Sequence, residues 1–176
     1  MSECDINAQL IKQAEKSAAD LIKKLKSQAL TLALSESCTA GLVSSFLAGI
    51  PGASDVLWGA FVCYTREAKI SMLGINGVEL DAYRYVSRDT ACLMAKGALE
   101  KSGANIAAAV TGLAGPGGDG SNVPVGTVWA ACALQGALKG GEIKAREFRF
   151  TGSRSEIRIQ AACAVLEMLL NMLDTK

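Results

Sequence analysis

Apolar residues recur every three or four positions near both ends of the chain, whereas the middle contains short unbroken apolar runs. The spacing over residues 5–26 and 155–173 predicts amphipathic helices there. Short apolar runs bounded by Gly, Pro, Ser or Asn favour buried strands. Strands are predicted over residues 30–34, 56–64, 105–111, 123–133 and 142–150. Further helices are predicted over residues 40–48 and 66–73 and after Ser87, whose hydroxyl can cap a helix.

The order of these elements, α-β-α-β-α-α-β-β-β-α, predicts an α/β fold in which helices cover both faces of one sheet. The last two strands would form a hairpin with its turn at residues 136–141, which makes the sheet mixed rather than purely parallel. A chain of 176 residues is close to the usual size of one domain. We therefore expect a single domain over residues 1–176.

Charge and hydropathy exclude several classes of partner. Eighteen basic and seventeen acidic residues leave a net charge of +1, which argues against a nucleic acid or a membrane surface as partner. No apolar run reaches the roughly twenty residues of a membrane span. Residues 1–13 lack the apolar core of a signal peptide. We expect a cytoplasmic protein.

The six cysteines show no Cys-x-x-Cys spacing, and the chain contains no histidine. We expect reduced, mostly buried thiols and no zinc site. The lack of histidine also excludes Ser-His-Asp and Cys-His catalysis. A nucleophile in this chain would have to take its base from Lys, Tyr, Asp, Glu or water.

Residues 35–41, Ser-Glu-Ser-Cys-Thr-Ala-Gly, lie between a predicted buried strand and a predicted helix. In α/β folds ligands gather at the carboxyl ends of strands, and a helix N-terminus offers free N–H groups. A hydroxyl in this turn could be an ordinary helix cap. It could instead be a nucleophile, with the backbone N–H groups of Cys38 and Thr39 holding an oxyanion.

Tyr64 and Lys69 follow the second predicted strand, five residues apart. They could meet on one side of a strand-to-helix turn. There Lys69 could lower the pKa of a neighbouring hydroxyl, or act as a base if burial makes it neutral. The alternative, which spacing alone favours, is a core tyrosine and a surface lysine.

Two further segments could bind an anion. Residues 111–120 are glycine-rich, and glycines let backbone N–H groups approach a ligand closely. This segment matches neither a Walker loop nor a dinucleotide fingerprint. Arg154 and Arg158 lie four apart on one face of the last predicted helix and could grip a phosphate. The alternatives are a flexible surface loop and a solvated helical face.

Taken in order along the chain, these segments resemble the CinA C-terminal domain family, also known as the NMN deamidase family, from about residue 8 to residue 172. The matching motifs are Glu36–Gly41, Pro51–Ser54, Phe61–Lys69, Val86–Ser87, Thr111–Gly118 and Pro124–Gly126. Several ordered matches at family-like spacing are far more specific than any single motif. The resemblance implies a three-layer α/β/α sandwich with a mixed, mostly parallel sheet.

The resemblance also implies an amidohydrolase that converts nicotinamide mononucleotide (NMN) and water to nicotinic acid mononucleotide and ammonia, in NAD recycling, with no metal or cofactor. By position, Ser37 would be the nucleophile, assisted by Tyr64 and Lys69. We expect the Ser37 Oγ within hydrogen-bond reach of Tyr64 or Lys69. The pyridine nucleotide would bind at residues of the motif segments and the last helix, namely Cys38, Thr39, Thr111, Gly112, Ala114, Gly115, Arg154 and Arg158.

The chain departs from the family pattern at several positions. Thr65 and Arg66 replace Ser and Asn, and Val123 replaces Lys. The other departures are Gly59-Ala60 in place of Arg-Gly, Arg84-Tyr85 in place of Gly-Ala, and Ala40 in place of Gly. Two alternatives therefore stay open: a weakly active or inactive nucleotide- or protein-binding module, and an amidase for another small amide. We also expect no pyrophosphatase domain, and the aromatic-poor helices are compatible with a homodimer.

Overall fold

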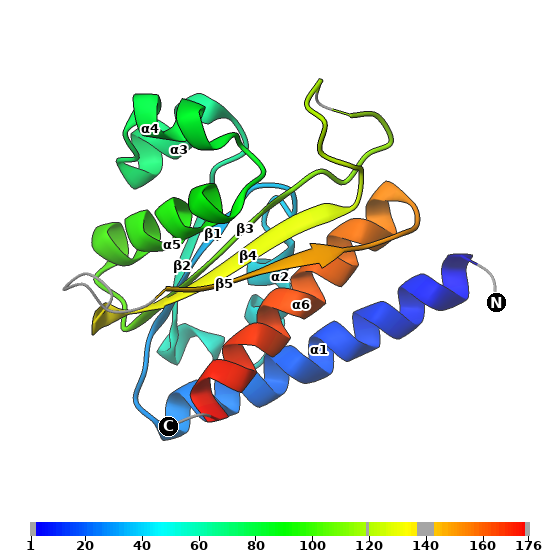
Figure 1. Cartoon of the computed structure of the whole chain (residues 1–176). Coiled ribbons are helices and arrows are strands. Elements are labelled where there is room, and N and C mark those ends of the chain that lie inside the picture. Colours follow the sequence, from blue (N-terminus) through cyan, green and yellow to red (C-terminus); the bar gives the residue numbers. More distant parts are fainter. Residues whose placement is uncertain (1–2, 119, 137–142, 175–176) are drawn as a thin grey trace.

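The computed structural model describes residues 3–118, 120–136 and 143–174 (Figure 1). Its strands are β1 (Leu32–Glu36), β2 (Leu57–Val62), β3 (Ile106–Gly112), β4 (Thr127–Leu134) and β5 (Ile143–Arg149). Its helices are α1 (Glu3–Ser27), α2 (Leu42–Ala48), α3 (Arg66–Leu73), α4 (Gly77–Tyr83), α5 (Arg88–Ser102) and α6 (Arg154–Asp174), with a short 3-10 helix η1 (Ala53–Asp55).

The five strands form one sheet in the order β2-β1-β3-β4-β5. β1 lies between β2 and β3 and runs parallel to both, whereas β4 is antiparallel to both β3 and β5. Of the five strands, only β4 therefore runs against the rest. The predicted mixed, mostly parallel sheet is confirmed.

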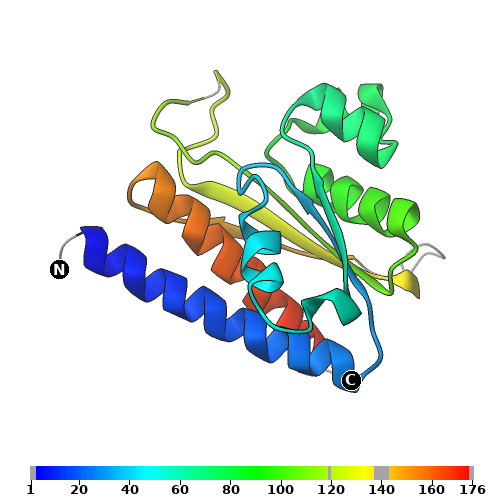
Figure 2. The ribbon, with the colours of Figure 1, turned by 180° about the vertical axis from the view of Figure 1, so that it is seen from behind.

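Helices cover both faces of the sheet, as Figures 1 and 2 show from opposite sides. Alternate residues of β3 face opposite layers because successive side chains of a strand point to opposite faces. Ala108 and Val110 pack in one cluster with α1, α2 and α6, whereas Ala107 and Ala109 pack in a second cluster with α5. The three-layer α/β/α prediction is confirmed. Among the described helices, none is both long and apolar enough to cross a membrane.

Two predicted boundaries move because residues with positive φ interrupt the elements. α2 begins at Leu42 rather than at residue 40, since Ala40 (φ 51°) and Gly41 (φ 92°) are left-handed. β4 begins at Thr127 rather than at residue 123. Gly126 (φ 90°) turns the chain there, and any side chain at this position would collide with the backbone carbonyl of Phe150.

Two further differences concern polar residues at element ends. β1 continues to Glu36 instead of ending at residue 34. The helix α4 was not predicted; Asn76 caps it by accepting hydrogen bonds from the amides of Val78 and Glu79, at 2.9 and 3.3 Å. The predicted hairpin turn at residues 136–141 lies, apart from residue 136, outside the described residues.

The topology determines where a ligand site can form. The parallel strands β1, β2 and β3 bring their carboxyl ends to the same edge of the sheet. The segments that follow them, residues 37–41, 63–66 and 113–118, therefore lie at one edge. In α/β folds this edge is where ligands bind.

Candidate active site

Ser37 follows β1 in a turn that Glu36 holds in place. The Glu36 side chain is buried, and its carboxylate accepts hydrogen bonds from the amides of Gly41 (2.9 Å), Val43 (3.2 Å) and Ser44 (2.8 Å). The first amides of α2 are thus satisfied by an acidic residue that precedes the helix by six positions. No hydroxyl of residues 35–39 caps α2, so the helix-cap interpretation of these hydroxyls is wrong.

The backbone of Ser37 is held from both sides. Its N–H donates to the carbonyl of Val110 at 3.0 Å, and its own carbonyl accepts from the Ala40 N–H at 3.1 Å. The Ser37 side chain is therefore presented from a rigid turn. The backbone N–H groups of Cys38 and Thr39 donate to no backbone or side-chain oxygen within the described segments.

Lys69 reaches Ser37 from the first turn of α3. Thr65 caps this helix by accepting a hydrogen bond from the Ala68 N–H at 3.1 Å. The Lys69 Nζ lies 3.1 Å from the Ser37 Oγ, as expected for a nucleophile and its base. Lys69 is only 2% exposed, and burial lowers the pKa of its amine below the ordinary 10.5.

The contacts of the Lys69 amine are compatible with its neutral form. Besides Ser37, its Nζ contacts two acceptors, the backbone carbonyls of Cys63 (2.9 Å) and Tyr64 (3.4 Å). A neutral amine has two N–H donors and one lone pair. With both donors on the carbonyls, the lone pair faces the Ser37 hydroxyl, which can donate its proton to it. No described carboxylate lies within ion-pair distance to keep the amine charged.

The Tyr64 side chain takes a different direction from the one that we expected. Its hydroxyl accepts a hydrogen bond from Arg154 Nη2 at 2.7 Å, and Arg154 Nη1 donates to the Gly115 carbonyl at 2.6 Å. The hydrogen bond between Lys69 and Tyr64 involves the Tyr64 backbone carbonyl. Tyr64 is 53% exposed, so it is not a core residue. Its phenol and the Arg154 guanidinium form a pair at the mouth of the site.

Arg158 supports the Ser37 turn from behind. Its guanidinium donates to the carbonyls of Cys38 (3.1 Å) and Thr39 (2.7 Å). These bonds orient the turn rather than a ligand. Burial raises the pKa of the neighbouring Cys38 thiol to about 12, so this thiol stays protonated and is a poor nucleophile at neutral pH.

Ser37 and Lys69 open into a cavity of about 330 Å³. This volume falls in the range of about 300–1,000 Å³ that is usual for small-molecule sites. The cavity is lined by Ser37, Cys38, Tyr64, Thr65, Arg66, Lys69, Tyr85, Val86, Thr111, Gly112, Leu113, Ala114 and Arg154. Eight of the eleven site residues proposed from the sequence are in this lining, whereas Thr39, Gly115 and Arg158 are not.

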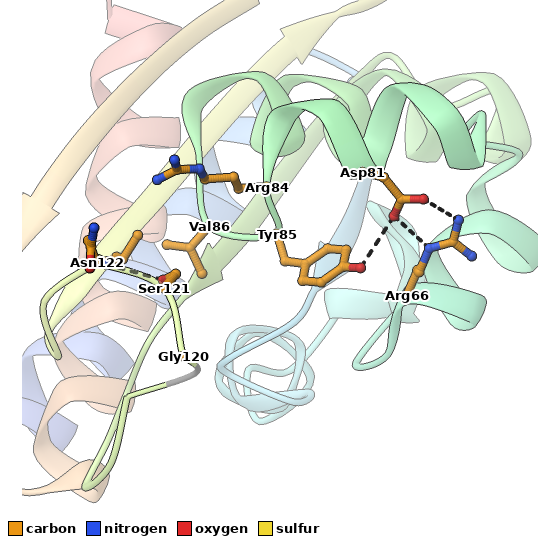
Figure 3. A pocket seen from close by; sticks show the side chains of 9 residues that line it. Arg66, Asp81, Arg84, Tyr85, Val86, Gly120, Ser121 and Asn122 are labelled. Carbon is orange, nitrogen blue, oxygen red and sulfur yellow. Dashed lines mark hydrogen bonds and ion pairs between the residues drawn. The ribbon is translucent and has the colours of Figure 1, made fainter.

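A second, larger cavity of about 720 Å³ adjoins the first and holds none of the proposed catalytic residues (Figure 3). The two share Arg66, Tyr85 and Val86. The larger cavity is lined by Arg66, Asp81, Arg84, Tyr85, Val86, Gly120, Ser121, Asn122 and Val123. Four of the departures from the family pattern therefore line the same cavity, namely Arg66, Arg84, Tyr85 and Val123. The sequence suggested that Arg66 and Val123 could reshape a ligand pocket, but it did not indicate that Arg84 and Tyr85 line the same cavity.

An ion pair forms one end of the larger cavity. Arg66 donates to both carboxylate oxygens of Asp81, at 2.7 and 2.6 Å, and the Tyr85 hydroxyl also donates to Asp81, at 3.3 Å. Asp81 thereby neutralises the charge that Arg66 brings to the site. Among the described residues, no three Cys, Asp or Glu side chains gather in a way that could hold a metal ion.

Comparison with known proteins identifies one family. Residues 14–173 match the family model described as the CinA C-terminal domain. A CinA-like protein of Akkermansia muciniphila is 42% identical over 147 residues, which are 84% of this chain and 34% of that protein. A CinA-like protein of Chlorobium luteolum is 40% identical over 149 residues, 85% of this chain and 35% of that protein. The chain thus spans about a third of these relatives.

Solved structures show the same fold. The competence/damage inducible protein CihA from Agrobacterium tumefaciens superposes with a TM-score of 0.84 at 40% identity, over 92% of this chain and 96% of that one. A CinA superfamily protein from Klebsiella pneumoniae gives a TM-score of 0.87 at 28% identity, over 93% and 99% of the two chains. Sequence, fold and matched length agree, and the chain belongs to the CinA C-terminal domain family.

Proposed function

We propose that this chain hydrolyses the carboxamide of NMN to give nicotinic acid mononucleotide and ammonia. One observation carries the proposal: the Ser37 Oγ lies 3.1 Å from the amine of Lys69, a buried lysine whose pKa is lowered. A neutral lysine next to a serine is a nucleophile–base pair that needs no histidine.

The reaction follows from these contacts. Ser37 Oγ attacks the carboxamide carbon as its proton passes to the Lys69 Nζ. The amide oxygen becomes an oxyanion, for which the N–H groups of Cys38 and Thr39 are the candidate donors. Lys69 then gives its proton to the departing nitrogen, which leaves as ammonia. Water, deprotonated by the same amine, cleaves the acyl-serine ester and releases the acid.

The cavity mouth supplies the groups that would orient the nucleotide. Arg154 uses two of its N–H donors on Gly115 and Tyr64. Within the described residues its other donors have no hydrogen-bond acceptor, so a ribose or phosphate oxygen could take them. Thr111 contributes shape rather than a free hydroxyl, because its Oγ1 donates to the Tyr85 carbonyl at 2.7 Å.

The test is release of ammonia from NMN by the purified chain and by Ser37→Ala. We expect Ser37→Ala to lose essentially all turnover. Ser35→Ala is the matched control, because Ser35 is also buried, lies two residues away and has a hydroxyl without a hydrogen-bond partner among the described residues. Its rate should equal that of the parent chain. Undiminished turnover by Ser37→Ala would refute the nucleophile assignment.

A second candidate function is hydrolysis of another small carboxamide. The departures Arg66, Arg84 and Val123 favour it, since they line the cavity beside the catalytic one. A panel of carboxamides compared with NMN decides between the two. Binding of NMN without ammonia release, even at high enzyme concentration, would instead favour a non-catalytic binding module.

A further inference from the structure

Arg84 stands in a backbone conformation that disfavours it. Its φ of 64° and ψ of 153° lie in a region that is populated almost only by glycine. Such a conformation persists in another residue only where its surroundings impose it. An arginine in a glycine-type conformation suggests that its side chain has a function.

The surroundings of Arg84 do impose this conformation. The Arg84 carbonyl accepts hydrogen bonds from the Ser87 Oγ (3.2 Å) and from the Oγ1 of the buried Thr90 (2.6 Å). The next carbonyl, that of Tyr85, accepts from the Thr111 Oγ1 at 2.7 Å. Three hydroxyls from α5, its cap and β3 thus hold two consecutive peptide groups. The Arg84 side chain therefore projects from a backbone segment that is held in place by hydrogen bonds.

The Arg84 guanidinium is a cation on the cavity wall. It lines the larger cavity and is exposed, and within the described parts of the chain no carboxylate lies within ion-pair distance of it. Arg66 differs, since Asp81 neutralises it. Figure 3 shows the two arginines apart, with Arg66 beside Asp81 and Arg84 extended toward the side where Ser121 and Asn122 lie.

We propose that Arg84 binds the phosphate of the nucleotide whose carboxamide Ser37 attacks, which makes it a specificity-determining residue for phosphorylated substrates. The inference rests on the proposed function for the position of the carboxamide. The two cavities adjoin through Arg66, Tyr85 and Val86, so one ligand can occupy both. A guanidinium offers planar paired donors that match a phosphate. The polar segment 120–122 forms the facing wall.

The test compares two ligands that differ only in the phosphate, NMN and nicotinamide riboside. Both are titrated by calorimetry into the Ser37→Ala chain, which prevents turnover. The ratio of their dissociation constants measures the preference for phosphate. With Arg84→Ala added, we expect this ratio to fall about tenfold or more, the usual loss for one charge-assisted hydrogen-bonding partner. An unchanged ratio overturns the inference.

Two more variants separate charge from structure. Arg88→Ala is the matched control, because Arg88 is an exposed arginine four residues away that lies beside Asp89 and outside both cavity linings. It should keep the ratio. Arg84→Gly removes the guanidinium and suits the backbone, so it should fold well and show the same loss as Arg84→Ala. If Arg84→Gly keeps the ratio, the inference fails even where Arg84→Ala is poorly folded.

The two proposals can fail separately. If the parent chain does not release ammonia from NMN but its phosphate preference depends on Arg84, the proposed function fails and the anion subsite stands. If NMN is hydrolysed and the preference for phosphate does not change in Arg84→Ala or Arg84→Gly, the subsite fails and the proposed function stands. A parent chain that binds NMN no better than the riboside also overturns the subsite.

Discussion

The two adjoining cavities differ in how far the fold itself satisfies their polar groups. In the Ser37 cavity, the Lys69 amine contacts three protein oxygens and the Arg154 guanidinium contacts two. In the larger cavity, the Arg84 guanidinium has no acid beside it in the described chain, and its backbone is one that glycine prefers. The first cavity is preorganised, since its polar groups are already held by the protein. Within the described residues, Arg84 of the second cavity has no acidic partner, and an anionic ligand could supply one.

The difference follows from the elements that build each cavity. Residues at and after the ends of the parallel strands β1, β2 and β3 supply most of the Ser37 cavity, and β1 and β3 are each held by a neighbouring strand on both sides. The larger cavity is lined by α3, α4, the link to α5 and segment 120–123. Connections of this kind tolerate substitution better than strand ends do. Four of the eight departures from the family pattern line this cavity, namely Arg66, Arg84, Tyr85 and Val123, whereas Ser37, Tyr64 and Lys69 of the other cavity match the family motifs.

The strongest test of the preorganised cavity is Lys69→Met, which keeps the length of the side chain and removes the amine. We expect turnover of NMN to fall by at least about a hundredfold, the usual contribution of a general base. Ammonia release measured under single-turnover conditions checks this. Lys96→Met, which changes an exposed lysine of α5 outside both cavities, should turn over normally. A Lys69→Met rate within a fewfold of the parent rate would remove the distinction drawn between the two cavities.

The pH dependence sharpens the role of Lys69. Burial lowers the pKa of its amine, and only the neutral amine can accept the Ser37 proton. The rate should therefore be constant above that lowered pKa and fall about tenfold per pH unit below it. The free energy of unfolding should change with pH in the same direction as the rate. Between the lowered pKa and the ordinary 10.5 the unfolded chain binds more protons, so the free energy of unfolding rises with pH in this window.

Profiles of kcat/KM and of urea unfolding against pH check both expectations. Lys69→Met should lose the rise in stability. A rate limb whose midpoint lies at or above the ordinary lysine pKa, or an unfolding profile that is the same in both chains, would contradict a buried amine that is neutral in the active form.

The preorganised cavity also depends on the Glu36 carboxylate, which holds the amides of Gly41, Val43 and Ser44. Glu36→Gln keeps one acceptor oxygen and turns an NH2 group toward N–H donors. We expect a loss of about 1–3 kcal/mol in the free energy of unfolding, the usual effect of leaving buried hydrogen-bonding groups unpaired. Urea denaturation measures it. Glu67→Gln, on an exposed acid in the first turn of α3, is the control and should change stability little.

The sequence predicted the site better where the pattern was local than where it depended on packing. Helix α3 has the predicted bounds, and Ser87 caps α5 as predicted, accepting from the Thr90 N–H at 3.1 Å. The proximity of Ser37 to Lys69 was also expected, from the family motif. These features depend on short-range chemistry or on motif order, both of which can be inferred from sequence.

What could not be predicted lies in buried polar contacts and in backbone conformation. Glu36 was placed after the strand because the apolar run ends at residue 34, yet three amides stabilise its carboxylate at the end of β1. The Asn76 cap of α4 was a usable signal that was missed. The left-handed φ of Arg84 has no signature in a single sequence, because it results from contacts with Thr90 and Ser87. Tyr64 turned to Arg154 because the two side chains meet only through the fold.

The smallest expected effect concerns the larger cavity and tests whether Arg84 there costs the fold stability. Arg84→Gly replaces a residue in a region that only glycine occupies readily, so the folded chain loses backbone strain of about 1–3 kcal/mol. Glycine also gains freedom in the unfolded chain, which offsets roughly 0.5–1 kcal/mol of that gain. The net expectation is a rise of roughly 1 kcal/mol in the free energy of unfolding, measured by urea denaturation, together with loss of the phosphate preference. Stability and recognition would then oppose each other at Arg84, as they do when a fold retains strain for the sake of a ligand. A chain that Arg84→Gly destabilises would show instead that the arginine supports the fold, and the contrast between the two cavities would no longer hold.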